Sequence, residues 1–213
     1  FLSSISFSDF DDLRMGSHGP DEYLRNEYAV RRNGEDVVVA NDNPRVQKPT
    51  GYQQINLLQK VKFMPHKDWD LNLGLIYSTT SDFPRFDRLY RKRDGDLRTA
   101  EWYYGPQEWF MGNFKINKKG NGAFYDKAQM TTAYQFFEES RHNRDFGEDW
   151  LYNTKENVDA YSVNFDFEKT FEESRLFYGA EYVFNKVNST GFAENILTEE
   201  ENITASRYPD GST

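Results

Sequence analysis

The stretch WDLNLGLIYSTT, from Trp69 to Thr80, decides the fold because it alternates without a break. Apolar side chains recur at every second position from Trp69 to Tyr77, and the positions between them begin with Asp70 and Asn72. A period of two predicts a β-strand that lies between an apolar medium and a wet one. An aromatic ring at each end with leucines between them suits a slab of hydrocarbon at least as well as a protein core.

Composition favours an all-β chain. Of its 213 residues, 37% are hydrophobic and 17% are aromatic, with 14 Tyr and 18 Phe, which are residues that strands prefer. The net charge of −9 argues against a nucleic-acid partner, and the absence of cysteine excludes disulfides and thiolate metal sites. No run approaches 18 apolar residues, which excludes a transmembrane helix, whereas strands of a transmembrane barrel need only about 9–11 residues.

The same alternation predicts about seven antiparallel strands and no helix of useful length. The first strand already alternates from Phe1 to Phe7, and the sequence begins with neither Met nor a signal peptide, so we expect it to start inside a strand of a longer protein. The other strands are predicted at about Gly51–Phe63, Trp69–Thr80, Glu101–Asn117, Ala123–Phe137, Tyr161–Glu168 and Leu176–Phe184.

The predicted connections alternate in length. Long polar segments cover Phe10–Thr50, Ser81–Thr99 and Glu138–Glu156, and the chain is polar from Asn185 to its end, with a turn at Tyr208–Gly211. Short turns are predicted at Met64–Lys67, Asn117–Gly122 and Thr170–Glu173, and local hairpins at Asn33-Gly34 and Asp94-Gly95.

Outer-membrane barrels have short periplasmic turns and long extracellular loops, so this alternation favours a segment of a transmembrane β-barrel. A soluble, secreted β-sandwich or a surface adhesin that binds protein or glycan stays open as the alternative, because antiparallel sandwiches also alternate apolar and polar residues. A glycan-active β-domain enzyme is a more distant third reading.

The chemical motifs are few. Asp9, Asp11 and Asp12 lack the spacing of a calcium loop, and no histidine has a second ligand three or four residues away. Neither a phosphate-binding loop nor a nucleophile elbow occurs. We therefore expect no catalytic residue, no metal site and no cofactor, and we do not expect an enzyme.

Several longer segments carry a family resemblance. They are STTSDFPRFDRL (Ser78–Leu89), AEWYYGPQEWFMGNF (Ala100–Phe114), AYQFFEESRHNRDF (Ala133–Phe146), FYGAEYVFNKVNSTG (Phe177–Gly191) and SRYPDGS (Ser206–Ser212). They resemble the barrel of TonB-dependent outer-membrane receptors of the Bacteroidota type, and the resemblance covers nearly the whole chain.

This resemblance implies that residues 1–213 are one part of a 22-stranded barrel in the outer membrane of a Gram-negative bacterium. It also implies a plug domain and a TonB box that lie outside the chain, contact with outer-membrane lipid, and TonB-driven import of a small metal chelate such as an iron siderophore or haem, or of cobalamin.

Two expectations follow for individual residues. Leu71, Leu73, Leu75, Val163, Phe165, Tyr178, Ala180 and Tyr182 are expected to contact lipid, with Asn72, Asn164, Asp166 and Glu181 on the opposite, wet face. Guanidinium groups suit the carboxylates and catecholates of a metal chelate, and aromatic rings supply apolar walls. The candidate ligand-binding residues in the predicted extracellular loops are Arg85, Arg88, Tyr90, Arg91, Trp102, Tyr103 and Tyr104.

Overall fold

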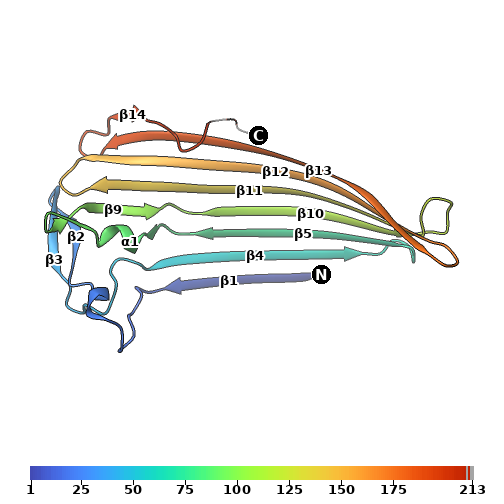
Figure 1. The fold of residues 1–213 in the computed structure, drawn as a ribbon, viewed down its shortest axis with the longest axis horizontal. Helices are drawn as coiled ribbons and strands as arrows, with labels where there is room; N and C mark the ends of the chain where they lie inside the picture. Colours follow the sequence, from blue (N-terminus) through green and yellow to red (C-terminus); the bar gives the residue numbers. More distant parts are fainter. Residues whose placement is uncertain (210, 212–213) are drawn as a thin grey trace.

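The computed structural model describes residues 1–209 and 211, which fold around one large antiparallel sheet (Figure 1). Neighbouring strands follow one another in the chain, so the sheet is a meander with no crossover along its main path. Its strands are β1 (Leu2–Phe10), β4 (Tyr52–Phe63), β5 (Trp69–Thr80), β10 (Glu108–Lys119), β11 (Lys127–Asp145), β12 (Trp150–Thr170), β13 (Arg175–Asn195) and the short β14 (Glu201–Ile203). The prediction of seven long antiparallel strands is confirmed.

The register of the sheet brings the alternating apolar side chains of neighbouring strands to one face. Leu73 lies opposite Val61 on one side and Phe114 on the other. Residues that lie directly opposite each other in an antiparallel pair point to the same side of the sheet, so the period-two pattern of one strand continues on the next. The resulting apolar face includes Ile5, Ile55, Leu57, Leu71, Leu75, Ile116, Met130, Val163, Phe165, Ala180 and Tyr182.

Two rows of aromatic rings border the apolar face. The first row crosses four strands, with ring-centroid distances of 6.2 Å from Phe110 to Tyr134, 4.9 Å from Tyr134 to Tyr161 and 6.3 Å from Tyr161 to Phe184. The second row joins Tyr125, Phe167 and Tyr178 at 6.0 and 5.1 Å. Along β12 the rows are six residues apart, or about 20 Å of strand.

The opposite side of the sheet, which we call the polar face, holds Asn72, Asn164, Asp166 and Glu181. Asn164 lies opposite Glu181 in the register of β12 and β13, and Asn72 lies opposite Lys62 and Lys115. The prediction that these residues and the leucines of β5 lie on opposite faces of the sheet is therefore confirmed.

The predicted loop at Glu138–Glu156 is wrong. β11 continues to Asp145 and β12 begins at Trp150, so only residues 146–149 connect them. The hydrophobic period ends near Phe137, but the strands continue because charged side chains pair across them, as in the 2.7 Å contact of Lys155 Nζ with Glu138 Oε1. The predicted alternation of long and short connections therefore fails at its third long loop.

The predicted fourth strand is also corrected, because it consists of two strands. β9 (Thr99–Tyr104) pairs with the end of β11, whereas β10 pairs with the beginning of β11. Residues 105–107 separate them. Gly105 is required at this break because a Cβ atom there would lie 2.2 Å from the hydroxyl oxygen of Ser140.

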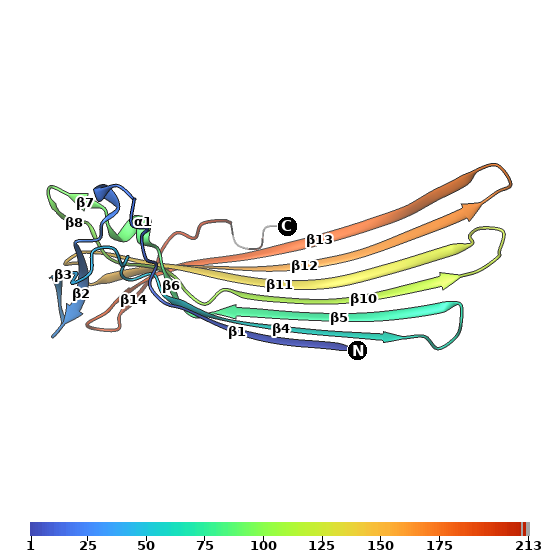
Figure 2. The same cartoon turned by 90° about the horizontal axis from the view of Figure 1, so that it is seen from below.

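Small elements gather at one end of the long strands, which we call the loop end (Figure 2). They are the hairpin of β2 (Glu27–Arg32) and β3 (Glu35–Ala40), the 3₁₀ turn η1 (Asp21–Tyr23), β6 (Phe83–Pro84), the helix α1 (Phe86–Leu89), and the hairpin of β7 (Lys92–Arg93) and β8 (Asp96–Leu97). The two predicted hairpin turns are confirmed, with positive φ at Asn33 and Gly34 and at Asp94 and Gly95.

The end of the chain differs from its prediction in one respect. β13 continues as far as Asn195, so the region after Asn185 is not a polar tail from its start. Beyond β14 the chain turns back along β13 (Figure 1), where the Tyr208 amide donates to Ser189 Oγ at 3.3 Å. The predicted turn at Tyr208–Gly211 lies partly outside the described residues.

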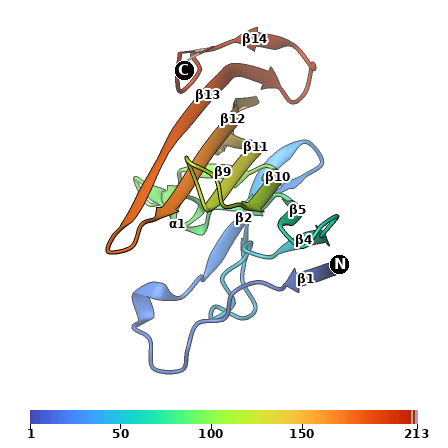
Figure 3. The same cartoon turned by 90° about the vertical axis from the view of Figure 1, so that its right-hand side faces the viewer.

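The sheet is open, with β1 at one edge and β13 and β14 at the other (Figure 3). Within residues 1–209 and 211, the only other sheets are the β2–β3 and β7–β8 hairpins, and both lie at the loop end. No second sheet from the described residues covers the apolar face, where Leu73 is 40% exposed and Tyr182 is 65% exposed. None of the helices in this part of the chain is long and apolar enough to cross a membrane.

Candidate functional site

A buried arginine fixes the loop-end elements to the sheet. Arg144 of β11, only 1% exposed, donates from Nη1 and Nη2 to the two carboxylate oxygens of Asp36 in β3, at 2.6 and 2.8 Å. It also donates to Glu101 of β9 and to the carbonyl of Glu148. Burial alone would raise the pKa of Asp36, but the bonds from Arg144 and from the Gly147 amide lower it below the ordinary value.

Three of the predicted ligand-binding residues come together on the polar face. The Arg85 guanidinium lies over the ring of Trp102, 4.8 Å from its centroid, and donates to the Tyr104 hydroxyl at 3.4 Å. Trp102 and Tyr104 meet edge to face at 5.1 Å. The cluster forms because β6 pairs with β9 and the Arg85 amide donates to the Trp102 carbonyl at 2.9 Å.

The cluster continues as a row of rings across the sheet. The ring centroid of Tyr104 lies 5.1 Å from that of Phe83. The Phe83 centroid lies 5.6 Å from that of Tyr52, and the Tyr52 ring stacks on Phe10 with the centroids 4.8 Å apart. These rings come from β1, β4, β6 and β9, so the row joins segments far apart in sequence. The row therefore places apolar surface at the loop end of the polar face.

Tyr103 does not join this cluster, because alternation along β9 places it on the other side of the sheet. There it stacks on His142 with the ring centroids 4.6 Å apart, and burial raises the pKa of Tyr103 to about 12. Of the three neighbouring candidates, Tyr103 therefore lies on the other side of the sheet from Trp102 and Tyr104. Tyr90 also stays apart, 51% exposed and packed on Phe86.

His142 takes part in a chain of hydrogen bonds that resembles a catalytic triad in its residue types. Its Nε2 lies 2.9 Å from Ser140 Oγ and its Nδ1 lies 2.5 Å from Asn153 Oδ1. Ser140 is only 9% exposed, and Gly105 packs so closely on its hydroxyl that even a methyl group would not fit between them. A substrate carbonyl has no room at this serine, and the hydrogen bonds instead join β11 to β12 beside the stacked ring of Tyr103.

Two adjoining cavities open on the polar face at the loop end. The smaller, of about 90 Å³, is lined by Arg88, Arg91, Arg98, Thr99, Trp102, Asn143 and Asp145. The larger, of about 330 Å³, shares Arg98, Asn143 and Asp145 with it and adds Glu148, Trp150 and Tyr152. The smaller cavity thus brings together three predicted candidates, Arg88, Arg91 and Trp102. The sequence did not single out the other main lining residues, which are Arg98, Asn143, Asp145, Trp150 and Tyr152.

A charged group lies beside the Arg85 cluster. Arg141 sits over the Tyr104 ring at 5.7 Å, pairs with Glu139 and lies 3.8 Å from Glu156. Gln107 donates to Glu139 at 3.0 Å. Burial raises the pKa of Glu156 despite the positive charges of Arg141 and Arg207. The contact of Arg141 with Glu156 depends on the register of β11 with β12, within a segment that the sequence predicted to be a loop.

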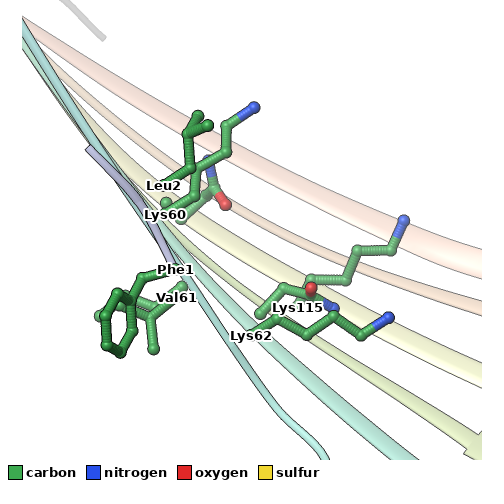
Figure 4. Close-up of a pocket in the computed structure, with 10 residues that line it drawn as sticks. Phe1, Leu2, Lys60, Val61, Lys62 and Lys115 are labelled. Atoms are coloured by element: carbon green, nitrogen blue, oxygen red, sulfur yellow. The ribbon is translucent and has the colours of Figure 1, made fainter. Parts of the chain in front are cut away.

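Other cavities lie on the sheet away from the loop end. One, of about 450 Å³, lies near the N-terminus of β1, where Lys60, Lys62 and Lys115 extend to the polar face and Phe1 and Val61 to the apolar face (Figure 4). Lys62 pairs with Asp70 at 2.6 Å. A more apolar hollow on the polar face is lined by Trp109, Gln135, Phe137, Val158 and Ala160.

Among the described residues, no group of three or more His, Asp or Glu is arranged to hold a metal ion. Comparison with known proteins adds no identity, because no protein family, no curated protein and no solved structure matches the chain. What remains to indicate a function is the pair of faces of the sheet and the side chains and cavities at the loop end.

Proposed function

We propose that this chain is part of the wall of an outer-membrane transport barrel of the TonB-dependent receptor type, which imports a scarce ligand such as an iron chelate, haem or cobalamin. The observation that carries the proposal is the pair of aromatic rows that border the apolar face. Transmembrane barrels have an outward apolar band about 25 Å tall with an aromatic girdle at each interface. A soluble sheet has no need for such borders.

The polar face supports the same proposal. Its residues Asn72, Asn164 and Glu181 lie on the side of the sheet opposite the leucines of β5, as lumen-facing residues do in a barrel wall. The open edges at β1 and β13 would be costly in lipid unless further strands pair with them, so we propose that strands from elsewhere in the protein close the barrel.

Energy coupling in this proposal comes from a region outside the chain, and the contribution of these residues is recognition. Arg85, Trp102 and Tyr104 lie at the loop end of the polar face, where a ligand entering from outside would first meet the lumen. A cation over an aromatic ring and further guanidinium groups beside it suit a ligand that has both negative charge and apolar surface.

Cysteine accessibility tests the proposal directly, because residues 1–213 contain no cysteine of their own. In the full-length protein in intact cells or outer-membrane vesicles, Leu73→Cys is expected to resist a water-soluble maleimide. Asn72→Cys, one position away on the polar face, serves as the matched control and is expected to react. Both variants react after denaturation.

Equal labelling of the two variants in intact membranes would overturn the proposal, as would loss of the protein from the membrane pellet after a carbonate wash. Either result would favour a soluble sheet whose apolar face is covered by another protein.

A further inference from the structure

The two adjoining cavities at the loop end differ in chemistry, and the difference selects a kind of ligand. Arg88, Arg91 and Arg98 surround the smaller cavity, against the single carboxylate of Asp145. Trp150 and Tyr152 line the larger one. Because Arg98, Asn143 and Asp145 line both cavities, the two cavities lie side by side.

The size of the smaller cavity limits what enters it. Its volume of about 90 Å³ is roughly a quarter of the 330 Å³ of the larger cavity. The smaller cavity suits a compact group such as a carboxylate, phosphate or sulfate. The larger cavity has room for one or two rings.

The arginines of the smaller cavity retain hydrogen-bonding capacity. The Nε–H of Arg88 is buried and has no acceptor in the described part of the chain, and Asp87 Oδ2 lies 3.7 Å from it. Arg98 Nε is 3.8 Å from Asp145 Oδ2, beyond hydrogen-bond distance. Arg91 Nε donates to the Asp87 carbonyl at 3.0 Å. Because each guanidinium has five N–H donors, these side chains can bind an oxyanion without first breaking strong pairs.

We infer that the two cavities form one binding site for a ligand that joins a compact oxyanion, such as phosphate, sulfate or carboxylate, to an aromatic or other flat ring. The oxyanion occupies the arginine-lined cavity beside Trp102, and the ring occupies the cavity beside Trp150 and Tyr152. This inference rests on the proposed function for the idea that the ligand is cargo, but the binding chemistry does not depend on transport.

The site lies on the polar face, opposite the apolar face. The Trp102, Asn143 and Tyr152 positions share a register row, and that row is on the side of Asn72 and Asn164. A lipid phosphate at the membrane surface would approach from the other side of the sheet, so the geometry favours a free ligand over a lipid headgroup.

Calorimetry on the purified full-length protein tests the site with inorganic phosphate and phenyl phosphate as probes. We expect phenyl phosphate to bind about tenfold more tightly or better, because it fills both cavities. The triple variant Arg88→Gln, Arg91→Gln, Arg98→Gln is expected to bind both probes at least about a hundredfold more weakly, since charge-assisted bonds are strong and each tenfold is about 1.4 kcal/mol. Arg93→Gln, an exposed position in β7 that lines neither cavity, is the matched control and should bind as the wild type does.

Two further variants separate the cavities. Tyr152→Ala is expected to weaken phenyl phosphate and leave inorganic phosphate unchanged. Asp145→Asn removes the carboxylate that repels an anion, so it is expected to tighten both probes severalfold. Tighter binding cannot result from misfolding, so the Asp145→Asn variant still tests the inference if the triple variant is unstable.

The inference is overturned if the wild type binds neither probe, if the triple variant binds both as the wild type does, or if Asp145→Asn weakens binding. Competition by vesicles that contain a phosphorylated lipid would assign the site to a headgroup and would also overturn the assignment to a free ligand. Failure of the proposed function is a different result, because the cysteine labelling at Leu73 and Asn72 reports membrane insertion whether or not these probes bind.

Discussion

Asp36 and Arg144 are 108 positions apart in the sequence and form a bidentate ion pair in which both side chains are almost fully buried. The pair joins the β2–β3 hairpin to β11. Because the hairpin comes from the first long connection and Arg144 from a segment two-thirds along the chain, this contact fixes the loop-end elements in place.

Removal of the acid is expected to be costly. Asp36→Ala leaves the buried Arg144 with Glu101 as its remaining carboxylate, and breaking a buried ion pair typically costs about 3–5 kcal/mol. We expect faster amide hydrogen exchange across residues 27–40, measured by mass spectrometry. Glu35→Ala, at the neighbouring exposed position, is the control and should exchange as the wild type does. Unchanged exchange in Asp36→Ala would contradict the role of the pair.

Acid is expected to release the same hairpin. The pKa of Asp36 is lower in the folded protein than in the unfolded chain, so its ionisation stabilises the fold fully above about pH 4. This contribution is lost as the pH falls through the lowered folded value. Pepsin cleavage within residues 27–40 should therefore rise below pH 4 in the wild type. In Asp36→Asn the cleavage should depend less on pH, and an unchanged profile would argue against titration of this group.

The two faces of β5 are expected to differ in their tolerance of charge. An arginine at Leu73, midway between Trp69 and Tyr77, should cost about 2–4 kcal/mol if this position faces hydrocarbon, against about zero for Asn72→Arg. The measurement is the free energy of unfolding in lipid vesicles by denaturant titration of the full-length protein. Similar costs at the two positions would remove the distinction between lipid and lumen.

The aromatic row is expected to contribute to stability through ring contacts. Tyr161→Ala removes contacts with Tyr134 and Phe184, and aromatic pairs are worth about 0.5–1.5 kcal/mol each beyond the area that they bury. We expect a loss of about 2 kcal/mol or more in vesicles. Phe124→Ala, at a ring that is 81% exposed, should have a much smaller effect.

A glycine holds the returning segment close to β13. A Cβ atom at Gly191 would lie 2.5 Å from the carbonyl oxygen of Ala205, which is closer than real side chains approach. Gly191→Ala should therefore displace residues 204–208 and raise their hydrogen exchange, with protection of β12 unchanged. Gly16→Ala, where a Cβ would meet no atom within 4 Å, is the control.

The sequence was sufficient for the parts of the fold that depend on local pattern. β4, β5 and the two-residue hairpin turns were predictable because alternation and Asn-Gly or Asp-Gly dipeptides determine them locally. The extensions of β11 and β12 were not, because the apolar alternation stops near Phe137 and the strands depend on cross-strand pairs such as Lys155 with Glu138.

The candidate site was predictable only in part for the same reason. Arg88, Arg91 and Trp102 stood out as arginine and aromatic residues in a polar segment, and the structure groups them. Asn143, Trp150 and Tyr152 were hidden in the segment predicted to be a loop, and only the register of β11 with β12 brings them to the arginines. Strand alternation within the WYY run places Tyr103 on the other face from Trp102 and Tyr104.

Because the chain breaks at residues 105–107, the single long strand β11 pairs with two separate strands, β10 and β9. β10 sets its register on the first part of β11 without any help from β9, which docks separately on the last part. Residues 81–104 can therefore lengthen, shorten or change composition while the wall beneath keeps its alignment. In evolutionary terms, residues 81–104 form a segment that can be exchanged without resetting the register of β10 on β11.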